Sequence, residues 1–256
     1  MLRMLIVGVN GFVGHHLTRR IIETTDWEVR GVDLRSHRIE PWLAHPRFAF
    51  VEDDITRSRD GMEAQVRACD VVLPLAAIAT PETYVRDPLR VFELDFDANL
   101  PIVRHCVRHG KRLVFPSSSE VYGMCSDAAF DPDHSSLVYG PINKPRWIYA
   151  SAKQLMDRVI HAYGHQEGLR YTLFRPFNWI GPGLDSLQPR KHSSSRVVSQ
   201  FLARIVQGEP LQLVDGGRQR RCFTFIGDGV DALMKIIANT GNVADRKIYN
   251  IWPPGQ

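Results

Sequence analysis

The sequence predicts an α/β protein with a doubly wound parallel sheet, followed by a smaller lobe. Three observations predict this class. Short apolar runs rich in β-branched residues alternate with stretches that carry apolar residues at helical spacing. Several of the short runs are apolar on both faces, as strands are when helices cover both sides of a parallel sheet. A glycine-rich turn joins the first strand to the first helix, a connection typical of doubly wound folds.

Strands and helices are expected to alternate along the first two thirds of the chain. The strands are expected at Leu2–Val7, Val29–Val32, Phe48–Val51, Val71–Leu75, Arg112–Pro116 and Tyr171–Arg175. The helices are expected at Val13–Glu23, Leu89–Arg108 and Tyr149–Glu167. This alternation predicts one α/β domain over residues 1–175.

The chain changes character after Pro176. The expected elements there are a loop, a helix, a short strand and a last strand, at Gln188–Ser195, Val197–Val206, Leu211–Val214 and Lys247–Ile251. We therefore expect residues 176–256 to form a small, partial lobe, with some of its elements returning to the sheet.

Composition and charge narrow the class of protein. Of the 256 residues, 44% are hydrophobic and 23% are charged, as is ordinary for a globular protein. The net charge of +4 is mild, and the densest basic runs are Arg19-Arg20 and Arg218-Gln219-Arg220-Arg221. The sequence has no broad basic face with a reading motif, so we expect no nucleic-acid partner. A mildly basic surface suits an anionic small molecule as a ligand.

Cysteine usage and hydropathy predict a cytoplasmic protein without a metal or a membrane segment. Cys69, Cys106, Cys125 and Cys222 are scattered and form no Cys-x-x-Cys pair, which argues against a disulfide framework or a zinc site. A glycine motif follows the first strand too soon for a signal peptide. No apolar stretch approaches the ~20 residues that a membrane span needs.

The glycine motif is the first candidate binding site. It reads Gly8-Val9-Asn10-Gly11-Phe12-Val13-Gly14. Glycines here permit a tight turn and bring backbone N–H groups close to a pyrophosphate, while the helix amino terminus favours an anion. The Gly-x-x-Gly-x-x-Gly spacing is weak evidence alone. Its place between a strand and a helix predicts a dinucleotide-binding Rossmann domain over residues 1–175.

Other residues at the carboxyl edge of the sheet are expected to contact the dinucleotide. Asp33 ends the second strand, where a carboxylate accepts hydrogen bonds from both adenosine ribose hydroxyls and repels a 2′-phosphate. NAD is therefore predicted over NADP. Asp54-Ile55 follows the third strand, beside the expected adenine, and Leu75-Ala76-Ala77 ends the fourth with small residues that allow close approach.

A tyrosine and a lysine form the candidate catalytic pair. Tyr149 and Lys153 lie four residues apart, on one face of a predicted helix. An ammonium beside a phenol lowers its pKa, so we predict that Tyr149 acts as a base near neutral pH. Such pairs also occur on many surface helices. The run Ser118-Ser119-Glu120, at the end of the fifth strand, favours catalysis, because a hydroxyl there can hydrogen-bond a substrate alcohol.

Together these residues resemble those of the extended short-chain dehydrogenase/reductase family that acts on nucleotide sugars. Longer runs are similar to its UDP-glucuronate decarboxylases, of the kind found in a bifunctional polymyxin-resistance enzyme. These runs are Pro74–Pro81, Pro116–Met124, Asn143–Tyr149 and Leu173–Trp179. The likeness covers essentially the whole chain.

The resemblance implies a reaction and roles for the site residues. The reaction is NAD-dependent oxidative decarboxylation of UDP-glucuronate to a UDP-4-keto-pentose, a step in lipid A modification. Tyr149 with Lys153 would take the C4 hydroxyl proton, and Ser119 with Glu120 would serve the loss of CO₂. The implied substrate-binding residues of the small lobe and its surroundings are Tyr84, Arg146, Asn178, Arg196 and Arg221. A homodimer formed through helices that flank the sheet is also implied.

Several alternatives stay open. Reuse of the NADH would give UDP-xylose instead. Glu120 argues against a simple 4-epimerase but also fits a 4,6-dehydratase. Chains of the family continue past the position of Gln256, with more substrate lobe and a catalytic arginine. The alternative of another class is therefore a catalytically impaired NAD-binding or assembly protein.

Overall fold

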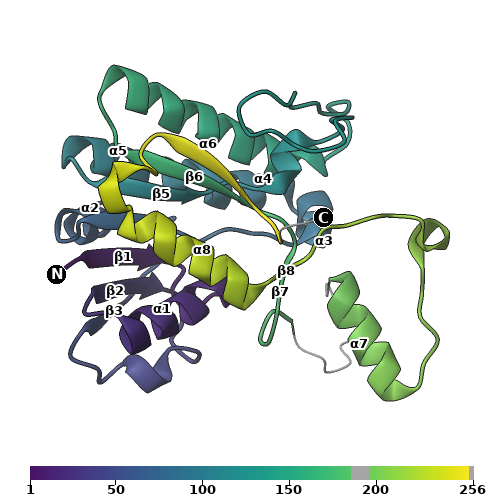
Figure 1. The fold of residues 1–256 in the computed structure, drawn as a ribbon, viewed down its shortest axis with the longest axis horizontal. Helices are drawn as coiled ribbons and strands as arrows, with labels where there is room; N and C mark the ends of the chain where they lie inside the picture. The colour runs from purple at the N-terminus through teal and green to yellow at the C-terminus, as the bar shows by residue number, and fades with distance from the viewer. Residues whose placement is uncertain (186–195, 254–256) are drawn as a thin grey trace.

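The computed structural model describes residues 1–185 and 196–253 of the chain. Its centre is a parallel sheet of seven strands in the order β3-β2-β1-β4-β5-β6-β9 (Figure 1). The strands are β1 (Arg3–Val7), β2 (Glu28–Asp33), β3 (Phe48–Glu52), β4 (Val71–Pro74), β5 (Arg112–Pro116), β6 (Tyr171–Pro176) and β9 (Lys247–Ile251). The predicted doubly wound sheet is confirmed. The predicted loop Gln188–Ser195 lies outside the described residues.

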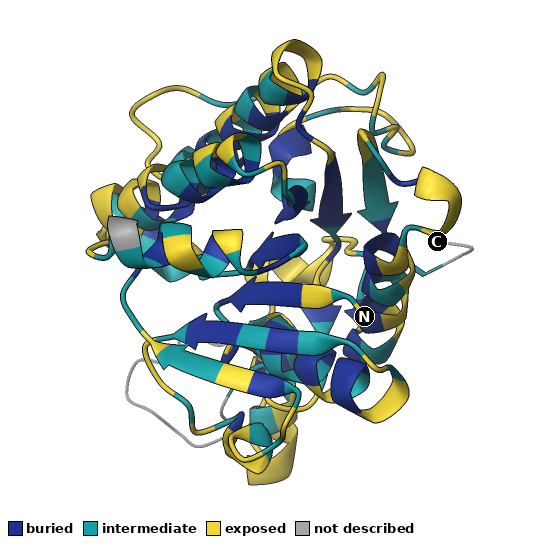
Figure 2. Cartoon of the chain, turned by 90° about the vertical axis from the view of Figure 1, so that its left-hand side faces the viewer, coloured by how far each residue is buried: buried dark blue, intermediate teal, exposed yellow. Residues whose placement is uncertain are grey.

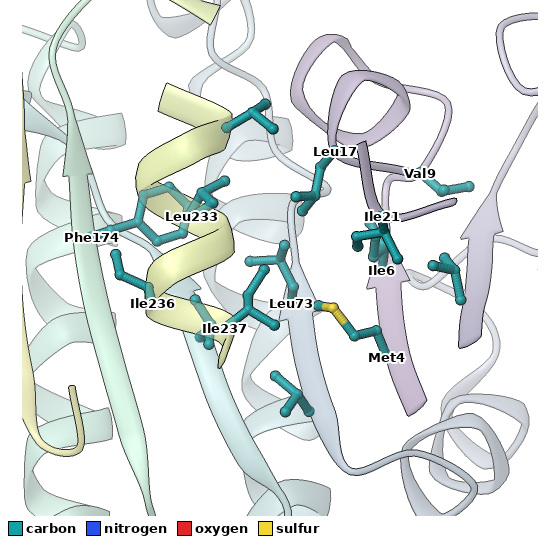
Figure 3. Packing of buried hydrophobic residues seen from close by; sticks show 14 of the residues in the cluster. Met4, Ile6, Val9, Leu17, Ile21, Leu73, Phe174, Leu233, Ile236 and Ile237 are labelled. Carbon is teal, nitrogen blue, oxygen red and sulfur yellow. The ribbon is translucent and has the colours of Figure 1, made fainter. Parts of the chain in front are cut away.

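The first face of the sheet is covered by α1 (Phe12–Thr24) and α8 (Ile226–Ala238). Leu17 of α1, Leu233 of α8 and Ile6 of β1 belong to one cluster and are all fully buried (Figure 3). Burying one such side chain contributes about 1.5–3 kcal/mol. This packing holds α8, which comes late in the chain, against the first strand and helix.

The second face is covered by α2 (Arg59–Arg67), α5 (Asn99–Arg108) and α6 (Trp147–Gln166). Ile102 of α5 and Ile160 of α6 lie in the hydrophobic cluster on this side. The strands between the two helical layers are largely buried (Figure 2). Helices on both faces explain why several strands are apolar on both sides.

The predicted helix over Leu89–Arg108 is divided by a wide turn. It consists of α4 (Pro88–Phe92), a π-helical turn at Glu93–Asp97, and α5. A shorter helix, α3 (Pro81–Arg86), precedes it. π-helical turns inside α-helices are rare and often mark functional sites. This one places the side chain of Asp95 in the interior, with no exposed surface.

Within the described residues, the small lobe contains a two-stranded sheet and a helix that does not cover the main sheet. Strand β7 (Trp179–Ile180) pairs with β8 (Thr224–Phe225), and α7 (Val197–Gln207) stands away from the main sheet (Figure 1). The predicted strand Leu211–Val214 is wrong. Among the described residues no strand pairs with this run, and its end turns into a 3₁₀ segment. A β-rich apolar run needs such a partner to bond its backbone.

The last part of the described chain rejoins the main sheet. Strand β9 pairs with β6 in parallel, from Thr172 opposite Lys247 to Pro176 opposite Ile251. The division of the chain at residue 175 into a cofactor domain and a substrate lobe stays a prediction.

Within residues 1–185 and 196–253, no helix is long and apolar enough to cross a membrane. The same residues hold no cluster of side chains suited to a metal ion.

Candidate active site

The glycine turn between β1 and α1 is packed against its neighbours so closely that side chains would not fit. A Cβ on Gly8, whose φ is +87°, would lie 2.7 Å from the backbone nitrogen of Ala76. A Cβ on Gly14 would lie 2.4 Å from the carbonyl oxygen of Gly8 and 2.7 Å from that of Val9. Glycine is therefore required at both ends of the turn by backbone contacts.

The amino end of α1 is suited to an anion. Gly11, which precedes this helix, has no side chain to cap its first N–H groups, and no other described residue is seen to do so. Unpaired N–H groups at a helix start, together with the helix dipole, attract phosphate groups. Phe12 and Val13, the first residues of the helix, line the cavity described below. The residues present therefore fit the pyrophosphate of a dinucleotide.

Asp33 is fixed beside this turn. Its Oδ2 accepts a hydrogen bond from the backbone N–H of Asn10 at 2.9 Å. The side chain of Asn10 holds the next loop, because its Oδ1 accepts from the backbone N–H of Arg38 at 2.7 Å. Burial raises the pKa of the Asp33 carboxyl, and hydrogen bonds from backbone N–H groups oppose the rise. The carboxylate thus stands at the carboxyl end of β2, where a ribose is bound in such folds.

The other predicted cofactor residues divide into two groups. Leu75, Ala76 and Ala77 follow β4, and the backbone of Leu75 and Ala76 lies against Gly8. Asp54 instead engages its own loop, since its Oδ1 accepts from the backbone N–H of Thr56 at 3.0 Å and from its hydroxyl at 2.7 Å. Ile55 is buried in the cluster on the second face of the sheet. The adenine contact of Asp54 and Ile55 stays a prediction.

Tyr149 and Lys153 lie in the first half of α6 and are both buried. The Tyr149 ring stacks on the ring of Tyr84, with centroids 4.6 Å apart and planes 5° from parallel. The Lys153 ammonium lies 3.4 Å from Oδ1 of Asp95 and 5.8 Å from the centre of the Tyr149 ring. The lysine is therefore close to the tyrosine but is paired with a carboxylate.

The prediction that Lys153 lowers the pKa of Tyr149 stays a prediction, because other groups around the phenol act on its pKa as well. Burial raises the pKa of the Tyr149 phenol above its ordinary value, and the negative charges of Asp95 and Glu120 raise it further. A hydrogen bond with Ser118 and the positive charge of Arg196 act in the opposite direction. The sequence pattern did not reveal Asp95, whose charge offsets that of the lysine.

A cavity of about 620 Å³ opens beside Tyr149. The predicted residues that line it are Phe12, Val13, Tyr84, Ser118, Ser119, Glu120, Tyr149, Asn178, Arg196 and Arg221. They come from α1, α3, the segment after β5, α6, and the small lobe. The cavity therefore joins the cofactor end of the sheet to the lobe after Pro176, within the size range of small-molecule sites.

The run Ser118-Ser119-Glu120 forms a short turn after β5. The Ser118 Oγ accepts a hydrogen bond from the backbone N–H of Glu120 at 3.1 Å. Arg146 does not line the cavity; its guanidinium donates to Oε2 of Glu120 at 2.8 Å. Arg146 is half-exposed, so this pair orients Glu120 and contributes little to stability.

The small lobe contributes two arginines and one asparagine to the cavity. Arg196 donates to Oδ1 of Asp185 at 2.9 Å and to the carbonyl of Ala79 at 3.0 Å, which ties the start of α7 to the segment after β4. Asn178 donates from its amide to the carbonyl of Cys222 at 2.7 Å. Arg221 has no carboxylate partner within the described part of the chain.

Sequence reasoning missed a buried polar network beneath the Ser118–Glu120 turn. Ser117 donates to Oδ2 of Asp157 at 2.7 Å, and Arg175 donates to the same oxygen at 3.3 Å. Arg175 also donates to the Tyr122 hydroxyl, which donates to Asn250, both at 2.8 Å. The network links β5, α6, β6 and β9. The one signal for it in the sequence is a set of polar residues within runs otherwise apolar.

Comparisons with known proteins agree with this geometry. Residues 4–251 match the model of the NAD dependent epimerase/dehydratase family. The crystal structure of the PbgP3 protein from Burkholderia pseudomallei is similar, with 64% sequence identity and a TM-score of 0.91. The similarity covers 99% of this chain and 75% of that one.

Two more distant structures share the fold. One is UDP-glucuronic acid 4-epimerase from Bacillus cereus in complex with UDP-glucuronic acid and NAD, at 20% identity and a TM-score of 0.80, covering 98% of this chain and 77% of that one. The other is DesIV, a dTDP-glucose 4,6-dehydratase from Streptomyces venezuelae with NAD bound. It has 24% sequence identity and a TM-score of 0.82, and the similarity covers 98% of this chain and 75% of that one. The predicted cofactor, NAD, is confirmed by the family match. The chain belongs to the NAD dependent epimerase/dehydratase family.

Proposed function

We propose that this protein catalyses the NAD-dependent oxidative decarboxylation of UDP-glucuronate to a UDP-4-keto-pentose. The observation that carries the proposal is the set of groups around one cavity. Tyr149 offers a base, Ser119 and Glu120 offer proton-transfer groups, and Arg196 and Arg221 offer positive charge. The similarity of the runs around these residues to UDP-glucuronate decarboxylases supports it.

The first stage is oxidation at C4 of the sugar. Bound NAD⁺ supplies a hydride acceptor. Tyr149, as the phenolate, takes the proton of the C4 hydroxyl as the C4–H bond breaks and its electron pair leaves as hydride. Burial disfavours this phenolate. The Ser118 hydroxyl and the positive charge of Arg196 act in the opposite direction and favour it. The product is a 4-keto sugar.

The second stage is loss of CO₂. The carboxylate at C5 is then β to the new carbonyl, so the C5–C6 bond can break with its electron pair moving into the carbonyl as an enolate. A proton then returns to C5. Ser119 and Glu120 line the same cavity as Tyr149, and Arg146 holds Glu120 in place at 2.8 Å. We assign these two residues to the decarboxylation stage.

The diphosphate is assigned to the small lobe. Arg221 donates only to the carbonyl of Arg220 and to the side chain of Gln219 among the described residues. An exposed guanidinium without a carboxylate partner can bind two phosphate oxygens at once. Asn178 and Arg196 line the cavity beside it.

The products of one incubation test the reaction. The protein is mixed with UDP-glucuronate and NAD⁺, and both the absorbance of NADH and the sugar product are recorded. NADH, CO₂ and a UDP-4-keto-pentose in equal amounts are the expected result. UDP-xylose without net NADH would replace the proposal by the non-oxidative decarboxylase. UDP-galacturonate would indicate a 4-epimerase.

The same incubation tests the alternative of another class. Measurable NAD binding without turnover of UDP-glucuronate or of other nucleotide sugars would favour an NAD-binding or assembly protein. A dTDP-glucose control tests the 4,6-dehydratase, which Glu120 also fits.

We also propose a homodimer through α4 and α6. Leu89 and Phe92 of α4 are 71% and 40% exposed, and Leu155 of α6 is 47% exposed, on helices that contact each other. Light scattering should give twice the chain mass, and Leu89→Arg should lower it toward that of one chain. A monomeric mass for the unmodified protein would contradict this assignment.

A further inference from the structure

Asp95 is a buried carboxylate that no predicted role explains. It lies in the π-helical turn before α5 and has no exposed surface. Its Oδ2 accepts a hydrogen bond from the backbone N–H of Ile78 at 2.9 Å. Its Oδ1 lies 3.4 Å from the ammonium of Lys153, which is 1% exposed. Burying either the Asp95 carboxylate or the Lys153 ammonium alone would cost free energy of folding, and each charge compensates the other.

The two oxygens of Asp95 connect two parts of the site. Ile78 belongs to the segment after β4, whose Ala76 packs on Gly8 of the cofactor turn. Asn99, one helical turn after Asp95, strengthens this link by donating to the carbonyl of Ala76 at 3.2 Å. Lys153 belongs to α6 and to the catalytic pair. The π-helical turn carries Asp95, and the two oxygens of this side chain meet these two partners.

The position of the lysine follows from this pairing. The Lys153 ammonium lies 3.4 Å from Oδ1 of Asp95, and it also lies over two aromatic rings, 5.1 Å from the centre of Phe115 and 5.8 Å from the centre of Tyr149. An ammonium that forms an ion pair with a carboxylate has part of its charge compensated, and that part is not available to a neighbouring phenolate.

We propose that Asp95 is a positioning residue of this site, which ties Lys153 to the segment after β4 and withholds part of the lysine's charge from the Tyr149 hydroxyl. The proposal rests on the proposed use of Tyr149 as the base. Asp95 itself touches neither substrate nor cofactor in this role. It sets the pH at which Tyr149 becomes active and the conformation of the segment that packs on the cofactor turn.

The charged and titratable groups around Tyr149 come from several elements. The carboxylates are Asp95, before α5, and Glu120, after β5; the cations are Lys153 of α6 and Arg196, at the start of α7. Tyr84 of α3 covers the ring. Of the two carboxylates, Asp95 raises the pKa of Tyr149 more than Glu120 does. Removing its charge is therefore expected to change the ionisation of the base most.

The test uses Asp95→Asn, Asp95→Ala and a matched control. Asp95→Asn keeps an oxygen that can accept from the Ile78 N–H but removes the charge, whereas Asp95→Ala removes both. Asp97→Asn removes the same charge from an exposed position of the same turn. The pH dependence of NADH formation in a single turnover and the affinity for NAD by fluorescence quenching are measured for each protein.

The three variants are expected to give different results. Asp95→Asn shifts the rise of the rate with pH by about one unit toward lower pH, because a neighbouring like charge no longer opposes the phenolate. Its NAD affinity stays close to that of the unmodified protein. Asp95→Ala weakens NAD binding by about tenfold, because the Ile78 N–H loses its buried acceptor. Asp97→Asn changes neither quantity.

The contradicting results are distinct from failure of the proposed function. Coincident pH profiles for Asp95→Asn and the unmodified protein, or an unchanged NAD affinity in folded Asp95→Ala, would overturn the role of Asp95. If UDP-glucuronate is not oxidised but another nucleotide sugar is, the proposed function fails and the pH profile is measured with that sugar. If no sugar is oxidised, the NAD affinities of Asp95→Ala and Asp95→Asn alone decide, and equal affinities overturn the proposal.

Discussion

The two ends of the candidate site are held in different ways. At the cofactor end, Gly8 and Gly14 are required by backbone contacts, and Asp33 is fixed by a hydrogen bond from the same turn. At the lobe end, Arg221 is a long, exposed side chain on a loop and has no carboxylate partner among the described residues. The cofactor end is therefore organised before a ligand binds, whereas the lobe end depends on a side chain that a ligand must order.

This difference predicts how each end responds to mutation. Changes to the glycines of the cofactor end should alter folding and NAD binding together, because one set of backbone contacts serves both, whereas loss of the Asp33 side chain should alter NAD binding alone. Changes at the lobe end should alter the affinity for the sugar nucleotide alone. The following predictions test that separation, beginning with the largest expected effect.

Gly14→Ala is expected to have the largest effect. Its Cβ would lie 2.4 Å and 2.7 Å from two backbone carbonyl oxygens, which cannot move without opening the turn. Overpacking of this kind costs about 1–3 kcal/mol of folding free energy. Thermal unfolding and NAD titration should show lower stability and loss of most NAD affinity. Gly11→Ala is the control, because its nearest contact is 3.1 Å. Equal effects of the two variants would contradict the packing argument.

Asp33→Ala should have the next largest effect, on the cofactor alone. Removing a carboxylate that accepts hydrogen bonds from ribose hydroxyls costs about 1.5–3 kcal/mol, or roughly ten- to hundredfold in NAD affinity. NADP should lose much less, because the carboxylate repels its 2′-phosphate. Isothermal titration with both nucleotides measures the ratio. A parallel loss for NAD and NADP would refute the ribose assignment.

Arg221→Ala should affect only the sugar nucleotide. Loss of a charge-assisted contact to a diphosphate is expected to raise KM for UDP-glucuronate by about tenfold, with NAD affinity unchanged. Arg220→Ala is a matched control, because the neighbouring arginine does not line the cavity. Steady-state kinetics at saturating NAD⁺ separate the two. An equal rise in KM for Arg220→Ala would show that the effect comes from loss of positive charge in this region and not from a specific contact between Arg221 and the diphosphate.

Glu63 provides the smallest expected effect, far from the cavity on the second face. Hydrogen bonds from His109 and Arg108 lower the pKa of Glu63 from 4.5 to about 2. Because the folded-state pKa is depressed, this stabilisation is complete above pH 4.5 and is lost as the pH falls toward 2. Melting temperatures of Glu63→Gln should therefore fall less over this range than those of the unmodified protein. Parallel curves of melting temperature against pH for Glu63→Gln and the unmodified protein would contradict the lowered pKa of Glu63. The control is Glu40→Gln, which changes an exposed carboxylate.

Local patterns predicted the parts of the fold that local contacts determine. The strands of the main sheet, the glycine turn and the helix that carries Tyr149 and Lys153 each follow from spacing within one short segment. The cavity residues could be named from the resemblance, and the structure brings Tyr149, Ser118 and Glu120 to one cavity. The roles of these residues stay predictions until the variants are measured.

Contacts between distant segments were beyond those patterns. The pairing of Lys153 with Asp95 depends on a π-helical turn, and that turn leaves no distinct spacing in the sequence. The bond from Arg175 to Tyr122 joins residues 53 positions apart. The run Leu211–Val214 has the composition of a strand, but no second strand lies beside it among the described residues. Tertiary context decides each of these features.

The central claim is that Tyr149 removes a proton from a sugar hydroxyl beside a bound dinucleotide. Tyr149→Phe tests it most directly, because the variant loses one oxygen while the glycine turn and Asp33 are unchanged. NADH formation from UDP-glucuronate and NAD affinity are measured on the same preparation. We expect hydride transfer to be abolished with little change in NAD affinity. Undiminished NADH formation in Tyr149→Phe would contradict the account.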